Sequence, residues 1–216
     1  MMIINTILDF LFPLRCVGCR ESGSYLCDKC SLEIRKAERE NLEWIYSLYD
    51  YRDPVIKKAL WLLKYKNKKP VAETFARLVY GIMLEEISEL VVMKNWQDPV
   101  LVPIPLSKRR LRERGYNQTE LMAKAIVKLD QNQNFKLETT WLKKTKETPR
   151  QAHIKNRNER LANLKGSFEV NPGIDIKGRN VILLDDVTTT GATLSEARKV
   201  LKSSGARDVV AFTLAH

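Results

Sequence analysis

The spacing of apolar positions along the chain predicts which segments are strands and which are helices. Runs rich in apolar and aromatic residues at 43–51, 100–106, 181–184 and 209–214 indicate strands. Apolar stripes at intervals of three and four residues predict helices beginning at Pro54 and Pro70 and helices over 117–129 and 194–203, and a charged helical stretch is expected over 31–40. From residue 99 onward strands and helices alternate. Such alternation predicts an α/β fold, a mainly parallel twisted sheet flanked by helices.

Length and composition agree with a folded domain. The chain has 216 residues, which fits one domain with a small appendage, and its 44% hydrophobic and 29% charged residues exclude the disordered and membrane classes. No stretch reaches the ~18 apolar residues of a membrane-spanning helix, so we expect no stable membrane insertion and a cytoplasmic location. The apolar opening, residues 1–14, has no basic start and no cleavage site, and its spacing predicts a short docking helix. Attachment of this helix to a membrane surface is the lesser alternative.

The charge balance is strongly basic. Lys and Arg number 37 against 26 Asp and Glu, which gives a formal charge of +11. Such an excess attracts anionic partners, either nucleotide phosphates or a nucleic acid backbone, but it also serves solubility alone. Composition does not separate these interpretations.

All four cysteines lie within one short segment near the N-terminus. Cys16 and Cys19 form one Cys-x-x-Cys pair, and Cys27 and Cys30 form a second after seven intervening residues. Two such pairs complete a tetrahedral zinc shell, and four protein ligands leave no open position for catalysis. Disulfides are the alternative for clustered cysteines, but nothing in the sequence indicates secretion. We therefore predict a structural zinc module.

The segment with the clearest chemistry is VILLDDVTTTGAT, residues 181–193. A buried strand would deliver Asp185 and Asp186 to its carboxyl end, and a loop would then turn into a helix whose N-terminal N–H groups can bind an anion. Threonine hydroxyls add donors, and Gly191 lets the backbone close around a phosphate. The two carboxylates repel a phosphate and suit ribose hydroxyls or a metal-bound pyrophosphate. The segment therefore predicts a site for a sugar phosphate.

This segment resembles the phosphoribosyl pyrophosphate (PRPP) loop of type I phosphoribosyltransferases. The resemblance implies that Asp185 and Asp186, the catalytic candidates, bind the ribose hydroxyls directly and through Mg²⁺ waters. It also implies that the following loop cradles the 5′-phosphate. The implied PRPP-binding residues are Asp185, Asp186, Thr188, Thr189, Thr190, Gly191, Ala192 and Thr193.

Further segments are similar to the ComF (late-competence) family. The VPIPL run at 102–106, with Arg109 and the Arg114-Gly-Tyr-Asn-Gln118 sequence, resembles the element that leads into the pyrophosphate loop of that family. Gln151 and Arg160, with Asn163, Gly166 and Phe168 after them, resemble its mobile loop. The resemblance implies a zinc module fused to a phosphoribosyltransferase fold. We expect residues 1–42 to form the N-terminal helix and zinc module. Residues 43–216 would form the phosphoribosyltransferase-like domain, with a hood-like region and helices over 43–98 and the core over 99–216.

Two classes of function remain open at this point. The first is an enzyme that transfers ribose 5-phosphate from PRPP to an unknown base or amine, held by a hood around residues 44–63. The second is a PRPP-binding protein of DNA uptake, for which the family implies single-stranded DNA and uptake or recombination proteins as partners. The basic residues after the VPIPL run and in the mobile loop fit either the pyrophosphate or a single-stranded backbone. Aromatic residues at 44–51 either stack on bases or simply pack.

Overall fold

A computed structural model of the chain describes residues 14–38, 42–147 and 163–216. The predicted N-terminal docking helix and the mobile-loop candidates Gln151 and Arg160 lie outside the described residues. In the described part of the chain no helix is long and apolar enough to cross a membrane.

The centre of the molecule is a five-stranded sheet in the order β1-β7-β6-β2-β3, in which every neighbouring pair is parallel. Its strands are β1 (Ile45–Tyr49), β2 (Val100–Pro103), β3 (Lys136–Leu137), β6 (Asn180–Val187) and β7 (Asp208–Ala215). A separate antiparallel hairpin consists of β4 (Leu142–Lys144) and β5 (Phe168–Val170). The mainly parallel sheet predicted from the alternating pattern is confirmed.

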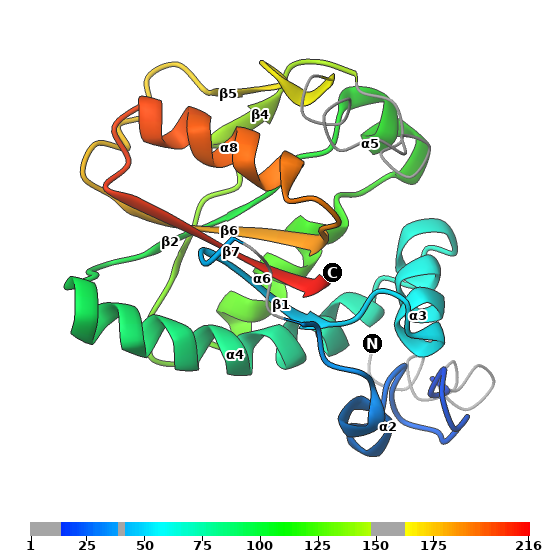
Figure 1. Cartoon of the computed structure of the whole chain (residues 1–216). Coiled ribbons are helices and arrows are strands. Elements are labelled where there is room, and N and C mark those ends of the chain that lie inside the picture. The colour runs from blue at the N-terminus through cyan, green and yellow to red at the C-terminus, as the bar shows by residue number, and fades with distance from the viewer. Residues whose placement is uncertain (1–13, 39–41, 148–162) are drawn as a thin grey trace, which may run out of the picture.

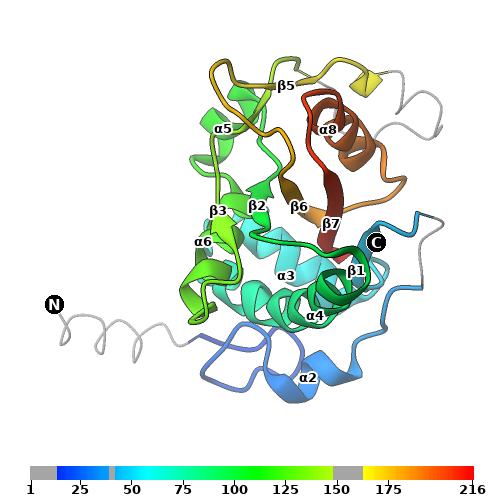
Figure 2. The same ribbon diagram turned by 90° about the vertical axis from the view of Figure 1, so that its left-hand side faces the viewer.

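Helices cover both faces of the sheet (Figure 1). One face carries α8 (Ala192–Ser203), and the other carries α4 (Val71–Lys94) and α6 (Gln118–Leu129). The remaining helices are α2 (Asp28–Glu33), α3 (Pro54–Tyr65) and α5 (Lys108–Arg114). A quarter turn shows the same layers edge-on, with α2 below α4 (Figure 2). Three layers of this kind bury both faces of the sheet.

Alternate residues of the central strand β6 point to opposite faces. Ile182 and Leu184 pack in the cluster that contains α4 and α6, whereas Val181 and Leu183 pack in the cluster beneath α8. All four side chains are fully buried. A strand covered on both sides must be apolar at every position, which is why its sequence reads as an unbroken apolar run.

Three local expectations need correction. The helical stretch expected over 31–40 ends at Glu33 as α2, and Ile34 is extended. The strand expected over 181–184 extends further, through Asp185 and Asp186 to Val187. Helix α5 was not anticipated, because its sequence KRRLRER carries a single apolar residue.

Candidate functional site

The site lies where the connections of the sheet diverge. Strands β2 and β6 are neighbours, but the chain leaves β2 towards α6 on one face and leaves β6 towards α8 on the other. When the connections after two neighbouring strands go to opposite faces, a crevice remains outside the carboxyl ends of these strands. Ligands of open α/β sheets bind in this crevice. A cavity of about 1220 Å³ occupies this position.

The segment after β2 forms one side of the cavity and is held by buried hydrogen bonds. The amide of Asn117 and the hydroxyl of Thr119 both donate to the carbonyl of Ile104, at 3.0 and 2.8 Å. Asn117 also caps α6, since its side chain accepts from the backbone N–H of Thr119. Gly115, with φ of 79°, ends α5 in the left-handed conformation that favours glycine.

The sequence Arg114-Gly-Tyr-Asn-Gln118 therefore has a structural purpose as well as a charge. Tyr116 donates its hydroxyl proton to the carbonyl of Leu63 in α3, and Arg114 donates to the side chain of Gln118. These contacts tie α3 and α5 to the same edge of the sheet. Arg114 and Gln118 also line the cavity.

The loop after β6 is preorganised by its own backbone. Thr188 donates its N–H to the carbonyl of Ala215 in β7 at 3.0 Å, and its hydroxyl accepts from the N–H of Gly191 at 3.1 Å. Gly191 has φ of 68°, and a Cβ at this position would lie 2.8 Å from Cδ1 of Leu42. Helix α8 starts at the next residue without a side-chain cap. No described side chain caps its first N–H groups, and the first residues of the helix, Ala192 and Thr193, line the cavity.

Asp185 and Asp186 lie at the end of β6 and differ in their partners. Asp186 forms an ion pair with Lys64 of α3 at 2.9 Å through Oδ1, while its buried Oδ2 has no hydrogen-bond partner among the residues that the structure describes. Asp185 accepts from the backbone N–H of Asp186 at 2.8 Å. Burial, together with the negative charge of Asp186, raises the pKa of Asp185 to about 7. The pair therefore combines one carboxylate with an unsatisfied oxygen and one that holds its proton unusually tightly.

Cationic side chains lie near these acids. Lys144 of β4 and Arg110 of α5 both line the cavity. Burial and the positive charge of Arg110 lower the pKa of Lys144 to about 8, although Asp185 opposes this effect. An anion that enters the cavity would meet positive charge from three different elements, because Lys64 comes from α3.

The structure brings most of the candidates together. Asp185, Asp186 and the whole segment Thr188, Thr189, Thr190, Gly191, Ala192 and Thr193 line the cavity, and so does Arg114. Arg109 does not line it: its side chain is half exposed and lies 3.8 Å from Glu113 and 3.6 Å from Glu147. The sequence indicated Lys144 only as one of several basic residues of the presumed mobile loop, and Lys64 only as the first residue of a basic loop. Neither segment shows by its sequence which lysine lies near the acids.

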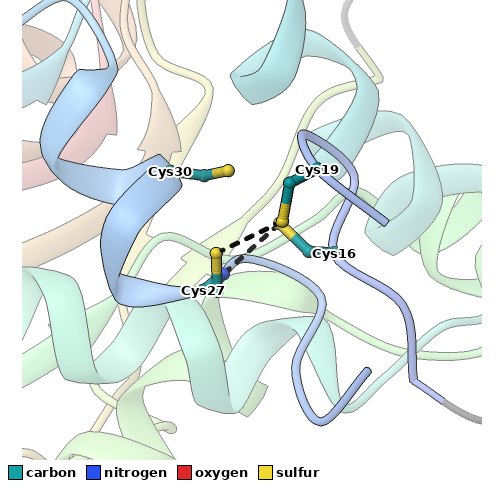
Figure 3. Close-up of side chains that lie close together, drawn as sticks. All are labelled: Cys16, Cys19, Cys27 and Cys30. Carbon is teal, nitrogen blue, oxygen red and sulfur yellow. Dashed lines mark hydrogen bonds between the residues drawn. The ribbon is translucent and has the colours of Figure 1, made fainter. Parts of the chain in front are cut away.

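The four cysteines converge near the N-terminal end of α3, where Asp53 and Val55 lie beside Cys19 and Cys30. Cys16 and Cys19 come from the loop before α2, and Cys27 and Cys30 come from its first turn (Figure 3). The four sulfur atoms lie within 4.8 Å of one another, and those of Cys19 and Cys27 are 3.6 Å apart. A tetrahedral zinc ion with Zn–S bonds of about 2.3 Å separates its sulfur ligands by about 3.8 Å. The cluster could therefore bind a metal ion such as zinc.

The thiol pKa values also indicate that the cluster favours a bound cation. Burial alone would raise the pKa of Cys16, but backbone N–H donors, Cys27 first among them, outweigh it and lower this pKa to about 6. The neighbouring Cys27 thiol, with burial, raises the pKa of Cys30 to about 12. Four thiolates so close together repel one another unless a metal ion neutralises them. Gly18 lies inside the cluster, where a Cβ would stand 2.8 Å from the sulfur of Cys30.

Fold and site together define a class of protein. It is a parallel α/β protein with paired acids and a glycine-containing loop at its switch-point cavity, joined to a four-cysteine module. The chain is 32% identical over 213 residues to "Competence protein ComFC" of Bacillus subtilis, which covers 98% of this chain and 80% of that protein. The chain belongs to the ComF family of competence proteins.

Other relatives carry related names. "Competence protein ComFC" of Streptococcus pneumoniae is 35% identical over 122 residues, which is 56% of this chain and 50% of that protein. "DNA utilization protein YhgH" of Escherichia coli K12 is 24% identical, with 92% of this chain and 87% of that protein covered. No family model matches the chain.

Solved structures similar to the chain include phosphoribosyltransferases. A hypoxanthine-guanine phosphoribosyltransferase of Bacillus anthracis has a TM-score of 0.42 at 14% identity, with 66% of this chain and 68% of that chain covered. The Trypanosoma cruzi hypoxanthine enzyme complexed with IMP has a TM-score of 0.41 at 12% identity, with 68% and 63% covered. These similarities are distant, and the family assignment does not depend on them.

Proposed function

We propose that this chain binds PRPP together with Mg²⁺ in the cavity at the carboxyl edge of the sheet and takes part in the handling of DNA during its uptake. Asp185 and Asp186 would bind the ribose hydroxyls and the waters of Mg²⁺. The segment from Thr188 to Thr193 would hold the 5′-phosphate. Arg114, with Arg110 and Lys144 beside it, would face the pyrophosphate, and Gln151 and Arg160 remain candidates for closure over it.

The observation that carries the proposal is the buried Oδ2 of Asp186, which has no hydrogen-bond partner in the described part of the chain. A buried carboxylate oxygen without a donor costs free energy, on the order of 1–3 kcal/mol. This oxygen has almost no exposed surface, so the Asp186 carboxylate would turn towards the cavity that it lines, and a ribose hydroxyl, or a water bound to Mg²⁺, would then donate to the oxygen and remove the cost. Asp186 lies beside the loop that would hold the phosphate of the same ligand, so one sugar phosphate would satisfy both groups.

The phosphate position is supported by the start of α8. Gly191 has no side chain to cap the helix, and its backbone conformation turns the chain around the site. The first N–H groups of a helix that lack a cap favour an anion, and the helix dipole adds to the attraction. We place the 5′-phosphate there because the two carboxylates would repel it at the other end of the loop.

For the four-cysteine module we propose structural zinc. Its four sulfur atoms lie within 4.8 Å of one another, and four protein ligands would leave no position open on the ion. Thiols kept reduced for metal binding are typical of the cytoplasm, so we propose that compartment for the protein. The part in DNA uptake is proposed because the relatives are named for competence and DNA utilization.

Transfer of ribose 5-phosphate to a base or amine is the alternative activity of the same cavity. The basic groups near the acids would stabilise charge on departing pyrophosphate, as such a reaction requires. A shared fold does not establish an activity, so the acceptor and the reaction stay open.

The test is calorimetric titration of PRPP into the protein with Mg²⁺, for the wild type and for Asp185→Asn/Asp186→Asn. We expect micromolar binding by the wild type and none by the double variant. Asp175→Asn is the matched control, because it removes one exposed carboxylate outside the cavity and should change nothing. Absence of binding by the wild type would refute the PRPP site and leave DNA handling alone.

A further inference from the structure

Helix α3 turns an unusual face to the cavity. Its buried side consists of Ile56, Ala59, Leu60 and Leu63, which pack into the core. Its other side is basic and aromatic, and the residues of that side that line the cavity are Lys57, Lys58, Trp61, Lys64 and Tyr65. An amphipathic helix ordinarily presents small polar residues to solvent, so two large aromatic rings between lysines call for a reason.

The rings on this face are open, unlike most aromatic residues of the preceding strand. Trp61 is 46% exposed and Tyr65 is 54% exposed. By contrast, Tyr49 is buried, and Tyr46 stacks on Phe212 with ring centres 4.9 Å apart. The aromatic residues at 44–51, for which the sequence left base stacking open, therefore mostly pack inside the protein. More exposed are the rings of Trp61 and Tyr65, which the sequence did not suggest for stacking.

A cation lies over one face of each open ring, and a base could stack on the other face. The Nζ of Lys66 is 4.9 Å from the ring centre of Trp61, and the guanidinium of Arg114 is 5.7 Å from that of Tyr65. Tyr51, which lines the same wall at 37% exposure, has the Nζ of Lys57 at 5.8 Å. Rings interleaved with cations are the arrangement that binds single strands, in which bases stack on the rings and phosphates meet the charges.

The cavity is also larger than a sugar diphosphate needs. Its volume of about 1220 Å³ exceeds the ~300–1,000 Å³ typical of small-ligand sites. A ligand at the acids and the phosphate loop that reaches Arg114 with its pyrophosphate would leave Lys57, Lys58, Trp61 and Tyr65 uncovered. Besides Asp185 and Asp186, the one acidic residue among the described lining residues is Glu113, so this wall favours a polyanion.

We propose that the α3 wall, which comprises Lys57, Lys58, Trp61, Tyr65 and the neighbouring Arg114, binds a segment of single-stranded nucleic acid with bases stacked on Trp61 and Tyr65. The inference rests on the DNA-handling part of the proposed function and names the surface that would perform it. A strand on this wall would pass directly in front of the sugar-phosphate site, so the two ligands would share one cavity.

The test is fluorescence anisotropy of a short fluorescein-labelled oligothymidylate at low salt. Trp61→Ala/Tyr65→Ala should weaken binding about tenfold or more, because each lost stack removes a base contact, while the dependence of affinity on salt stays the same. Lys57→Gln/Lys58→Gln should weaken binding and also reduce the salt slope, by about 0.7 for each lysine that contacts a phosphate. Lys128→Gln, an exposed lysine of α6 outside the cavity, is the control for net charge and should bind like the wild type.

Calorimetry with Mg²⁺ and PRPP on the same variants shows whether the cavity is intact, since both aromatic side chains are exposed and neither belongs to the core. Wild-type affinity for the oligonucleotide in Trp61→Ala/Tyr65→Ala would overturn the inference and leave the proposed function standing. Absence of oligonucleotide binding by the wild type would instead refute the DNA-handling part itself. Displacement of the oligonucleotide by thymidine monophosphate at equal concentration would also overturn the inference. The exposed rings of Trp61 and Tyr65 would then belong to a site for a mononucleotide.

Discussion

The four-cysteine module and the cavity at the sheet edge are both candidate binding regions, but they are built in opposite ways. The module consists of a short loop and a six-residue helix, and its four sulfur atoms converge without a sheet beneath them. The cavity stands on five parallel strands, and its loop is held by hydrogen bonds to β7 and within itself. A bound metal would therefore supply the folding energy of the module, whereas the cavity exists before its ligand arrives.

Helix α3 connects these two regions. Cys16, Leu26 and Ile34 of the module belong to the same buried cluster as Ile56 and Leu60 of α3. The opposite face of α3 is the aromatic and basic wall of the cavity. Unfolding of the module would therefore affect the cavity through this helix. The resulting change in ligand affinity measures how independent the two regions are.

The largest expected effect is loss of the metal from the module. Cys16→Ser, which removes a buried sulfur ligand, should abolish binding of about one zinc ion per chain and unfold residues 14–38. Structural zinc contributes on the order of 10 kcal/mol to the folding of such modules. Metal analysis and limited proteolysis would detect both changes. Affinity for PRPP with Mg²⁺ should fall only a few-fold, because the sheet holds the loop.

A chelator applied to the wild type provides the control, since it removes the metal without changing a side chain. Chelation and Cys16→Ser should give the same proteolytic pattern. Complete loss of PRPP binding in either case, with the secondary structure of the sheet retained, would contradict the independence of the cavity.

A smaller effect separates the two adjacent acids. Asp186→Asn leaves Lys64 without its partner and should lower the free energy of unfolding by about 1–3 kcal/mol, less than for a fully buried pair because Lys64 is one-fifth exposed. Asp185→Asn should raise it by about 1–3 kcal/mol at pH 8, because the wild-type carboxyl is ionised there at the expense of burial. Denaturant unfolding of the ligand-free protein measures both changes.

The pH dependence gives the same distinction with a definite sign. The pKa of Asp185 in the folded protein, about 7, is above its unfolded value of about 3.9, so the folded state binds more protons between these values. Its contribution to stability is therefore complete below about pH 4 and is lost as the pH rises to 7. Asp185→Asn should make the free energy of unfolding less dependent on pH in this range.

A double variant tests the ion pair of Asp186. In a Lys64→Met background, Asp186→Asn should no longer lower the free energy of unfolding. If it still did, the ion pair would not be the cause of the destabilisation.

The sequence predicts the sheet well because burial on both faces leaves few choices. Residues 181–184 form a covered strand as predicted, although β6 continues through both acids to Val187, and Gly191 directly precedes the next helix. Helix α5 and the end of α2 escape prediction for the opposite reason. Both are short, and α5 exposes almost all of its side chains, so its sequence lacks the periodic apolar positions from which a helix is predicted.

The candidate site is predictable only where its residues are consecutive. The loop from Asp185 to Thr193 is contiguous, so spacing alone assembles it. Lys64 reaches Asp186 across 122 positions of sequence, and Lys144 reaches the same cavity from the separate hairpin. Charge patterning shows that these segments are basic but does not show which cation meets which acid. That information exists only in the packing of α3 and β4 against the edge of the sheet.

The smallest expected effect concerns two neighbouring arginines of α5. Arg110 lines the cavity and lowers the pKa of Lys144, whereas Arg109 lies over Glu113 and Glu147 at the surface. Arg110→Gln should weaken PRPP binding about tenfold, as expected for the loss of one charge-assisted contact, and should raise the pKa of Lys144. Arg109→Gln should change affinity less than about twofold, because exposed ion pairs contribute about 0–1 kcal/mol. Calorimetry on the two variants makes the comparison at constant net charge. Equal losses would mean that α5 rotates when the ligand binds and brings Arg109 into the cavity.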